Sequence, residues 1–234
     1  MNTGRDGSTQ PPPAAPVSIL VGTVLAGGAS LRMGRDKAVL APGGVSLAAS
    51  AAERLAAVCA EVAVADGGRG VLPDLPSLPD GPGRGPVAGI LGAAAAYPGR
   101  PLLVLACDLP RVPAALLAEL ARAGGLARSE GNDELDWVVP RWTGGLEPLC
   151  AFYSPAALAV LAERAGRGLL APHRLAEEER LVVRYLEGDF LARFGPPEEV
   201  FLNLNTPADL ERYTSSAPGT SPQAPQGQIS RRKS

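Results

Sequence analysis

Short apolar runs alternate with longer Ala- and Leu-rich segments along most of the chain. The short runs have the length and composition of buried strands, and the longer segments carry the 3.6-residue spacing of helices. This alternation is typical of a parallel sheet whose strands are joined by crossover helices. The predicted strands are Ser18–Leu25, Glu61–Ala65, Leu102–Ala106, Trp137–Pro140, Leu149–Tyr153, Leu181–Tyr185 and Val200–Leu204.

Two of the intervening helices carry clear end signals. Proline favours the first helical position, so one helix is predicted from Pro113 to Ala123, with Gly124 following its end. Ser154 is the predicted N-cap of a helix that begins at Pro155. Residues 66–86, with six glycines and five prolines, are predicted to be loop, and a loop of this length in a compact domain is a candidate lid or pocket wall.

One folded domain is expected between two disordered ends. Residues 1–16 and 215–234 are rich in Pro, Ser and Gln, and they cannot bury enough apolar surface to offset their conformational entropy. Residues 17–214 form the predicted domain. Because 46% of the chain is hydrophobic and only 4% aromatic, its core must consist mainly of Ala, Leu and Val.

Charge and composition exclude several classes of protein. The net charge of −2 provides no basic field for nucleic acid, and a single histidine, His173, excludes most zinc sites and histidine clusters. His173 lies among Arg and Glu residues and is read as a surface side chain. No segment other than residues 17–31 approaches a membrane span or signal peptide, and Arg5, Asp6 and a glycine interruption disfavour that reading.

The three cysteines indicate a reducing compartment. Cys59, Cys107 and Cys150 are odd in number, widely spaced and set in apolar stretches, which fits reduced thiols better than a disulfide framework. The expected location is the cytoplasm, with no membrane partner.

The first predicted strand leads directly into a glycine-rich basic loop, LAGGASLRMGRDK, over residues 25–37. Glycines allow backbone N–H groups to point inward, and Arg32, Arg35 and Lys37 add positive charge at the carboxyl end of a strand. The loop is therefore a candidate phosphate site of a nucleotide. The loop does not fit a Walker loop, because the spacing between its glycines differs, and it does not fit the dinucleotide fingerprint. A looser match to that fingerprint at residues 83–88 does not follow a predicted strand.

Lys37 and Lys233 are the two lysines among 22 basic residues. A strong preference for arginine has left a lysine in the loop, where a compact point charge is not interchangeable with a forked guanidinium. The alternative reading of Lys37 is an ordinary surface lysine.

Asp108 is the first carboxylate after the wholly apolar strand Leu102–Ala106. A carboxylate at the carboxyl end of a central strand is suited to Mg²⁺ that bridges nucleotide phosphates. The alternative role is a helix N-cap, but Pro113 places that cap near Val112. The neighbouring Cys107 is read as a buried apolar side chain.

The loop closely resembles the LAGGxSxRMGxDK signature of the molybdenum cofactor guanylyltransferases. The resemblance continues in order through GPVAGI at residues 85–90, CDLP at 107–110 and NLNTP at 203–207, and it covers about residues 18–213. It implies a three-layer α/β/α, Rossmann-like nucleotidyltransferase domain, whose mainly parallel sheet carries one antiparallel strand. The implied reaction joins GTP and molybdenum-bound molybdopterin into the guanine dinucleotide cofactor and releases pyrophosphate.

The resemblance also implies roles for individual residues. Asp108 would hold Mg²⁺, and an aspartate upstream of GPVAGI would contact the nucleotide, with Asp80 the nearest candidate and Asp74 the alternative. The residues implied for catalysis are Lys37, Arg32 and Asp108, and those implied for nucleotide binding are Leu25, Ala26, Gly27, Gly28, Lys37, Asp80 and Asp108.

The acceptor side of the implied site is less strongly marked. Asn203 and Asn205 would bind the cofactor substrate, or they would only bond their own turn. Glu147 and Pro148 resemble a family segment with a substrate-side role, whereas Thr206 to Asp209 reads as a helix start without a catalytic role.

Two other functions remain open from the sequence. A molybdopterin cytidylyltransferase, or another small-molecule nucleotidyltransferase, would share the loop, but cytidylyl members usually read LAAG where this chain reads LAGG. A non-enzymatic nucleotide-binding paralogue would be expected to lack Lys37 or Asp108. The implied partners are GTP and molybdopterin, with transient contact to molybdoenzymes or cofactor chaperones.

Overall fold

The computed structural model describes residues 17–27, 37–39, 44–126 and 135–215, to which all structural statements refer. The expected disordered ends at residues 1–16 and 215–234 lie outside this range, except for Ser215, which is the last residue of a helix. Within it, the strands are β1 (Val17–Leu25), β2 (Cys59–Ala65), β3 (Ser77–Leu78), β4 (Leu102–Ala106), β5 (Trp137–Trp142), β6 (Gly145–Leu146), β7 (Cys150–Tyr153) and β8 (Val183–Leu186).

The strands form one twisted sheet in the order β3-β2-β1-β4-β7-β5-β6, with β8 beside β5. The pairs β1–β2, β1–β4, β2–β3 and β5–β8 are parallel. Strand β7 runs antiparallel to both of its neighbours, β4 and β5, and β6 folds back on β5 as a short hairpin. The prediction of a mainly parallel sheet interrupted by an antiparallel strand is confirmed.

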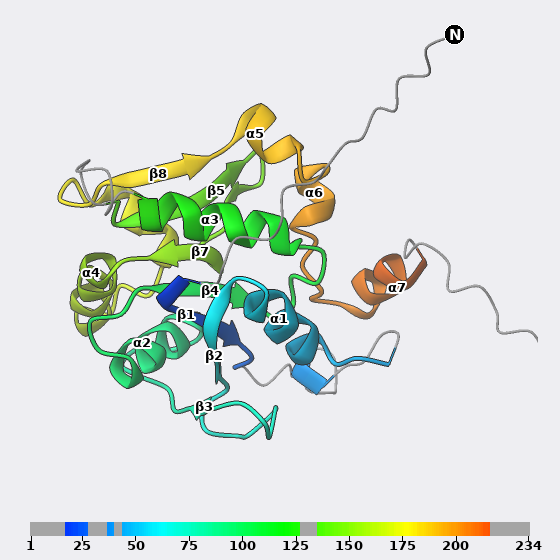
Figure 1. Ribbon diagram of the computed structural model, residues 1–234, viewed down its shortest axis with the longest axis horizontal. Coiled ribbons are helices and arrows are strands. Elements are labelled where there is room, and N and C mark those ends of the chain that lie inside the picture. The colour runs from blue at the N-terminus through cyan, green and yellow to red at the C-terminus, as the bar shows by residue number, and fades with distance from the viewer. Residues whose placement is uncertain (1–16, 28–36, 40–43, 127–134, 216–234) are drawn as a thin grey trace, which may run out of the picture.

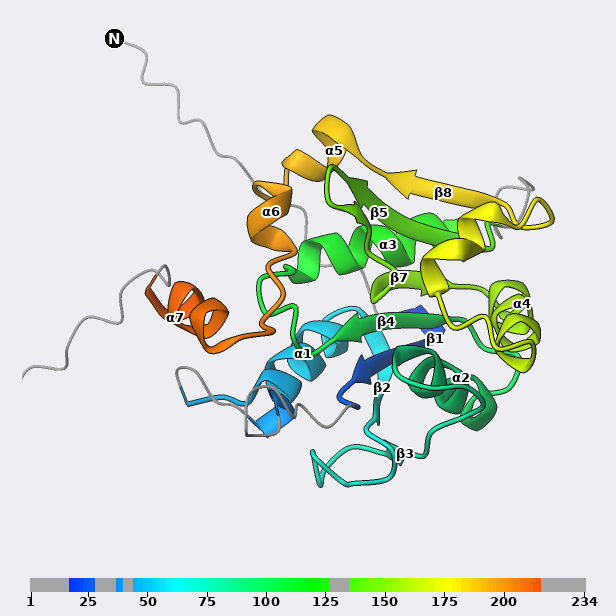
Figure 2. The ribbon, with the colours of Figure 1, turned by 180° about the vertical axis from the view of Figure 1, so that it is seen from behind.

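Helices cover both faces of the sheet (Figures 1 and 2). Helices α1 and α3 pack on one face, and α2 and α4 pack on the other. The helices are η1 (Lys37–Val39), α1 (Leu47–Ala56), α2 (Pro86–Ala96), α3 (Ala114–Leu126), α4 (Pro155–Gly166), η2 (Pro172–Glu177), α5 (Gly188–Ala192), α6 (Pro197–Val200) and α7 (Pro207–Ser215), of which η1 and η2 are 3-10 helices.

Small residues allow the α2 layer to approach the sheet closely. A Cβ atom at Gly89 of α2 would lie 3.2 Å from Leu25 Cδ2 and 3.3 Å from the Ala65 Cβ. Helix α2 is therefore packed directly on the ends of β1 and β2, where the sheet leads into its loops. Helix α4 begins as predicted, because the Ser154 side chain caps it by accepting a hydrogen bond from the Ala157 amide at 3.2 Å.

Three predictions about individual elements are wrong in detail. Residues 200–204 are no strand: Val200 ends α6, and the next residues pack irregularly, with Leu204 fully buried. Residues 66–86 include β3, which pairs with β2. Helix α3 continues through Gly124, where a Cβ would lie 2.5 Å from the Phe152 ring, so this glycine permits close packing and does not end the helix.

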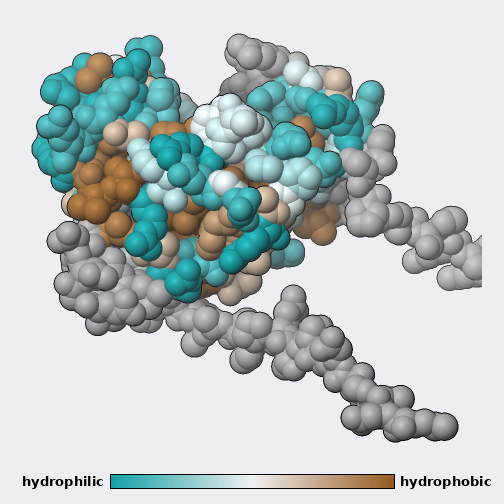
Figure 3. All heavy atoms as spheres, turned by 90° about the horizontal axis from the view of Figure 1, so that it is seen from above, coloured by the Kyte–Doolittle hydropathy of each residue, from teal (hydrophilic) through white to brown (hydrophobic). Residues whose placement is uncertain are grey.

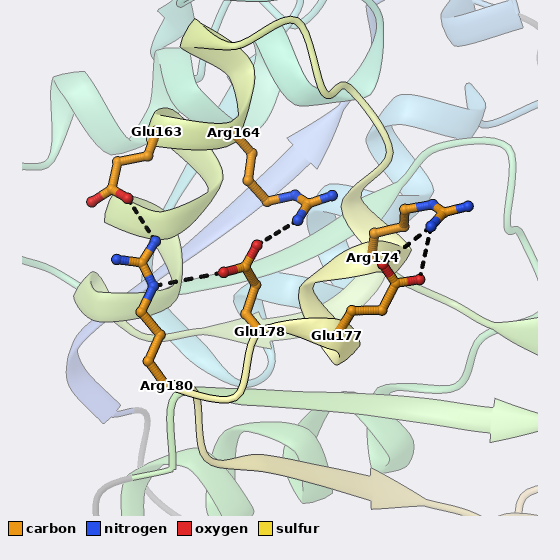
Figure 4. Close-up of polar contacts among 6 residues, drawn as sticks. All are labelled: Glu163, Arg164, Arg174, Glu177, Glu178 and Arg180. Atoms are coloured by element: carbon orange, nitrogen blue, oxygen red, sulfur yellow. Dashed lines mark hydrogen bonds and ion pairs between the residues drawn. The ribbon is translucent and has the colours of Figure 1, made fainter.

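An ion-pair network fastens η2 and the following turn to α4 (Figure 4). Arg164 of α4 pairs with Glu178, and the two side chains are only 7% and 17% exposed. Arg180 extends the network, because it lies 3.7 Å from the Glu178 carboxylate and bonds Glu163 at 2.6 Å. Buried pairs of this kind fix one element against another, because removing either partner leaves a charge without compensation.

The surface seen from above is mostly hydrophilic, and its hydrophobic residues gather in separate patches (Figure 3). Among the described residues, no helix is long and apolar enough to cross a membrane.

Candidate active site at the carboxyl edge of the sheet

The central parallel strands end at the same level. Leu25, the last residue of β1, pairs with Ala65 at the end of β2 and with Ala106 at the end of β4. The chain leaves β1 toward β2 and β3 on one side, then crosses to β4 on the other side of β1. This reversal creates a crevice at the carboxyl ends of β1 and β4, the usual ligand position in an open α/β sheet.

Asp108 lies beside this crevice, two residues beyond β4. The preceding amide, that of Cys107, donates to the Leu25 carbonyl at 3.1 Å, which joins the end of β4 to the end of β1. The Asp108 carbonyl accepts a hydrogen bond from the Leu204 amide at 2.9 Å. Asp108 does not cap the next helix, because α3 begins at Ala114.

Arg54 of α1 holds the loop that follows Asp108. Its Nη1 donates to the carbonyls of Leu109 at 3.0 Å and Val112 at 2.7 Å, and its Nε bonds the Ser50 carbonyl within α1. Burial lowers the pKa of Arg54 from its ordinary value. The guanidinium nevertheless binds backbone carbonyls, so it fixes the course of the chain immediately after Asp108.

Asp66 organises the loop after β2. The residue is buried, and its carboxylate accepts hydrogen bonds from the Gly68, Arg69 and Val71 amides and from the Ser77 hydroxyl. Burial alone would raise the pKa of Asp66, but these four donors together hold it below its ordinary value. The loop therefore has a fixed internal structure.

The structure separates the two candidate aspartates of this loop. The Asp80 carboxylate lies near the end of β2, since a Cβ at Gly67 would be 3.6 Å from it. Asp74 is exposed and belongs to a separate turn, which is closed by a hydrogen bond from the Leu75 amide to the Leu72 carbonyl. The Asp80 backbone is also held firmly. A Cβ at Gly92 of α2 would lie 2.0 Å from the neighbouring Pro79 carbonyl oxygen, so the chain lies directly on the helix.

The GPVAGI segment forms the start of α2. Gly85 adopts a positive φ of 59°, which a side chain would disfavour, and Pro86 occupies the first helical turn. Because α2 connects parallel strands, it begins at the carboxyl edge of the sheet, on the same side as Asp80.

Glu147 reaches this edge from the antiparallel strand. Since β7 is reversed, the residues that precede Cys150 lie level with the end of β4, where Cys150 pairs with Leu105. Trp142 Nε1 donates to Glu147 Oε1 at 3.2 Å, and the Trp142 ring stacks on Phe201. Burial raises the pKa of Glu147, the Trp142 bond opposes this rise, and the negative charge of Asp108 adds to it.

The NLNTP segment places Asn203 beside Asp108. Asn203 directly precedes Leu204, whose amide bonds the Asp108 carbonyl, and Asn203 Oδ1 is buried without a hydrogen-bond partner among the described residues. Asn205 is exposed, and its amide donates to the Asp209 carboxylate at 3.0 Å. Thr206 and Asp209 cap α7 reciprocally, as predicted from their spacing.

The remaining predicted residues are placed as follows. Leu25 and Ala26 are buried at the end of β1, and the adjoining Gly27 is exposed. Gly28 and Arg32 lie outside the described residues, and Lys37 begins η1, with only its backbone described. His173 is exposed on η2. The three cysteines are free and buried, and burial raises the pKa of Cys59 to about 12.

Sequence reasoning missed the structural roles of Asp66, Arg54 and Trp142. The Asp-Gly-Gly run after β2 signalled a turn organised by its aspartate. No local signal pointed to Arg54 or to the stacking of Trp142, because the carbonyls that Arg54 binds and the Phe201 ring lie in other segments of the chain.

A sheet with this topology, flanked by two helical layers and with polar groups at its carboxyl edge, defines a Rossmann-like nucleotidyltransferase. The model of the MobA-like NTP transferase domain matches residues 22–181, more than half of the chain. The molybdenum cofactor guanylyltransferase of Cereibacter sphaeroides is 35% identical over 204 residues, which cover 84% of this chain and 96% of that protein. The chain therefore belongs to the MobA-like NTP transferase family.

Solved structures agree with this assignment. The molybdopterin-guanine dinucleotide biosynthesis protein A of Archaeoglobus fulgidus superposes with a TM-score of 0.69 at 26% identity, covering 83% of this chain and 97% of that one. The 2-C-methyl-D-erythritol 4-phosphate cytidylyltransferase of Thermus thermophilus superposes with a TM-score of 0.61 at 20% identity, covering 85% and 98%. The latter similarity shows the shared fold.

Proposed function

We propose that this chain transfers GMP from GTP to the terminal phosphate of molybdenum-bound molybdopterin. An oxygen of the pterin phosphate attacks the α-phosphorus of GTP, the bond from this phosphorus to the bridging α–β oxygen breaks, and pyrophosphate leaves with the electron pair. The products are the guanine dinucleotide cofactor and pyrophosphate. The observation that carries the proposal is the meeting of the LAGG segment, Asp108 and Asn203 at one edge of a sheet of this family.

In this proposal, the residues along the crevice divide between the two substrates. The nucleotide binds at the segment that begins with Leu25 and Ala26, where Gly27 and Gly28 supply backbone N–H groups, and Arg32 and Lys37 supply positive charge to its phosphates. Asp80 binds on the same side, a role supported by the position of its carboxylate beside Gly67 and by the close packing of the neighbouring Pro79 against Gly92 of α2. The assignment of Asp80 in place of Asp74 follows from that position.

Asn203 and Asn205 are assigned to the acceptor side, across the crevice from β2 and β3. The proximity of Asn203 to Asp108 supports its role, because the acceptor phosphate must approach the α-phosphorus. Glu147, with the stacked rings of Trp142 and Phe201 behind it, extends the polar edge toward β5.

The donor atoms at this edge fit Mg²⁺. Asn203 Oδ1 is a buried oxygen that lacks a partner among the described residues, and Glu147 supplies a second carboxylate from the segment that lies beside the end of β4. Hard oxygen donors of this kind suit Mg²⁺. Asp108 would hold the ion with help from Asn203, and the bound ion would neutralise phosphate charge.

We also place this reaction in the cytoplasm, which the free, buried cysteines support. The product cofactor is expected to pass to molybdoenzymes or cofactor chaperones through transient contacts.

The experiment is a nucleotide panel with molybdenum-bound molybdopterin and Mg²⁺. Pyrophosphate release is measured with GTP, CTP and ATP at equal concentration, and the organic product is identified by mass. GTP is expected to give the highest kcat/KM. A higher value with CTP would reassign the chain to cytidylyl transfer, and no release with any nucleotide would contradict enzymatic function.

A further inference from the structure

Ala26 lies at the start of the glycine-rich loop, directly after β1. Its amide donates to the Ala65 carbonyl at 3.1 Å, and its carbonyl accepts a hydrogen bond from Arg69 Nη2. Both backbone polar groups of Ala26 are therefore held by the end of β2 and the loop that follows it. The methyl group of Ala26 is buried, whereas the next residue, Gly27, is exposed.

Arg69 is itself held in place by the loop from which it comes. Its Nε donates to the Asp66 carbonyl at 2.7 Å, and its amide donates to the Asp66 carboxylate at 3.2 Å. Asp66 is buried and also bonds Val71 and Ser77. A fork of two guanidinium nitrogens thus joins the ends of β2 and β1 through two neutral carbonyls, an arrangement that a lysine cannot reproduce.

The hydrogen bond to Ala26 has a consequence for the neighbouring amide. In a planar trans peptide, the carbonyl of one residue and the N–H of the next point in opposite directions. When the Ala26 carbonyl is held toward Arg69, the Gly27 N–H is turned away from Arg69. The opposite side of this peptide is the β4 side, where the crevice and Asp108 lie.

We infer that Arg69 is a positioning residue, which orients the Ala26–Gly27 peptide so that the Gly27 N–H faces the nucleotide. It acts through the backbone of the loop and touches neither the reacting phosphate nor the acceptor. The inference rests on the proposed function, because it assumes that the nucleotide binds at the LAGG segment. It assigns the β2–β3 loop a defined task in preorganising that segment.

The test compares Arg69→Met and Arg69→Lys with the wild-type chain, using calorimetric binding of GTP with Mg²⁺. Both variants are expected to raise the Kd of GTP by about 10-fold or more, the loss expected for one hydrogen bond to a charged group. The KM of the molybdopterin substrate is expected to stay unchanged. A merely structural role would reduce the fraction of folded protein, and hence kcat, without changing the Kd of GTP.

The matched control is Arg122→Met, which removes an exposed arginine of α3 that pairs with Glu119. A Kd of GTP equal to the wild-type value in both Arg69 variants would overturn the inference. If Arg69→Met does not fold, the Kd of GTP in Arg69→Lys and in Ser77→Ala decides the role of Arg69. Ser77→Ala removes one hydrogen bond to Asp66 and so loosens the loop without altering the Arg69 guanidinium.

The NMR order parameter of the Gly27 N–H in the free protein separates this inference from the proposed function. Arg69→Met is expected to lower it from about 0.85 to below about 0.6, since the peptide loses its fixed orientation. An unchanged order parameter would overturn the inference even if GTP binds. A wild-type chain that binds no GTP would instead overturn the proposed function, and the order parameter of Gly27 would still decide the role of Arg69.

Discussion

The arginine side chains beside the candidate site serve a different purpose from those in the other half of the sheet. At the carboxyl edge of the β1–β4 half, Arg54 donates to backbone carbonyls of the loop after Asp108, and Arg69 donates to the carbonyl of Ala26. In the β5–β8 half and its α4 layer, Arg141 and Arg164 pair with the carboxylates of glutamates. A carbonyl is neutral and does not titrate, so the first arrangement fixes the backbone at all ordinary pH values, whereas the second depends on ionised partners.

The contrast indicates where function and stability are concentrated. The half with carbonyl-bound arginines carries the candidate nucleotide site, where the position of a peptide group decides binding. The half with ion pairs holds one element against another. Variants in the first half should therefore affect activity more than folding, and variants in the second half should do the opposite.

The largest expected effect is on turnover in Asp108→Asn. The substitution keeps size but removes the charge that would offset Mg²⁺, so kcat for pyrophosphate release should fall by about 10²-fold or more. The Tm should stay within about 3 °C of the wild-type value. Asp74→Asn, at the distant turn, is the control and should retain wild-type turnover, and full activity of Asp108→Asn at limiting Mg²⁺ would refute the assignment.

In the other half, Arg164→Met should destabilise the fold strongly. The substitution leaves the Glu178 carboxylate paired with the exposed Arg180 at 3.7 Å but without its buried partner, which costs about 2 kcal/mol or more of unfolding free energy. Denaturant titration measures the loss. Arg174→Met, which removes an exposed pair with Glu177, should change stability by less than about 1 kcal/mol. Equal losses in the two variants would show that burial of the Arg164 pair is unimportant.

Two neighbouring glycines of α3 test close packing between the halves. Gly124→Ala would place a Cβ 2.5 Å from the Phe152 ring and should cost about 2 kcal/mol through overpacking. Gly125→Ala meets no atom within 4 Å and should be neutral or stabilising by about 0.5 kcal/mol, since alanine favours the helix. Thermal unfolding of both variants provides the comparison, and a stable Gly124→Ala would contradict the packing argument.

The smallest expected effect concerns Asp66 and pH. Its folded-state pKa lies below the ordinary value, so the unfolded chain takes up the proton first as the pH falls. The stability that Asp66 contributes is therefore complete above the ordinary carboxyl pKa of about 3.9 and is lost as the pH falls through the lower folded value.

Asp66→Asn should accordingly cost about 1 kcal/mol at pH 7, because the neutral amide cannot accept from all four donors. The difference in the free energy of unfolding between Asp66→Asn and the wild type should become smaller when the pH falls below the ordinary carboxyl pKa. Urea titrations at pH 7 and at pH 3 measure both values. A difference that is the same at both pH values would show that the charge of Asp66 is unimportant to the loop.

The sequence by itself determined the features that depend on nearest neighbours. Strand Leu102–Ala106 was predicted with its observed ends, and Ser154 and Thr206 cap the helices that follow them. Each of these features is decided within a few residues by apolar runs or by one side chain bonding a nearby amide. The position of a carboxylate directly after β4 likewise follows from the local pattern.

Only the tertiary structure decided the features that join distant segments. The apolar run at residues 200–204 is buried as a strand would be, but it packs irregularly, since Leu204 bonds the Asp108 carbonyl instead of a neighbouring strand. Gly124 faces a ring on β7, and Arg69 reaches the Ala26 carbonyl across 43 residues of chain. Periodicity shows that a residue is buried, but the packing partner depends on how the whole chain folds.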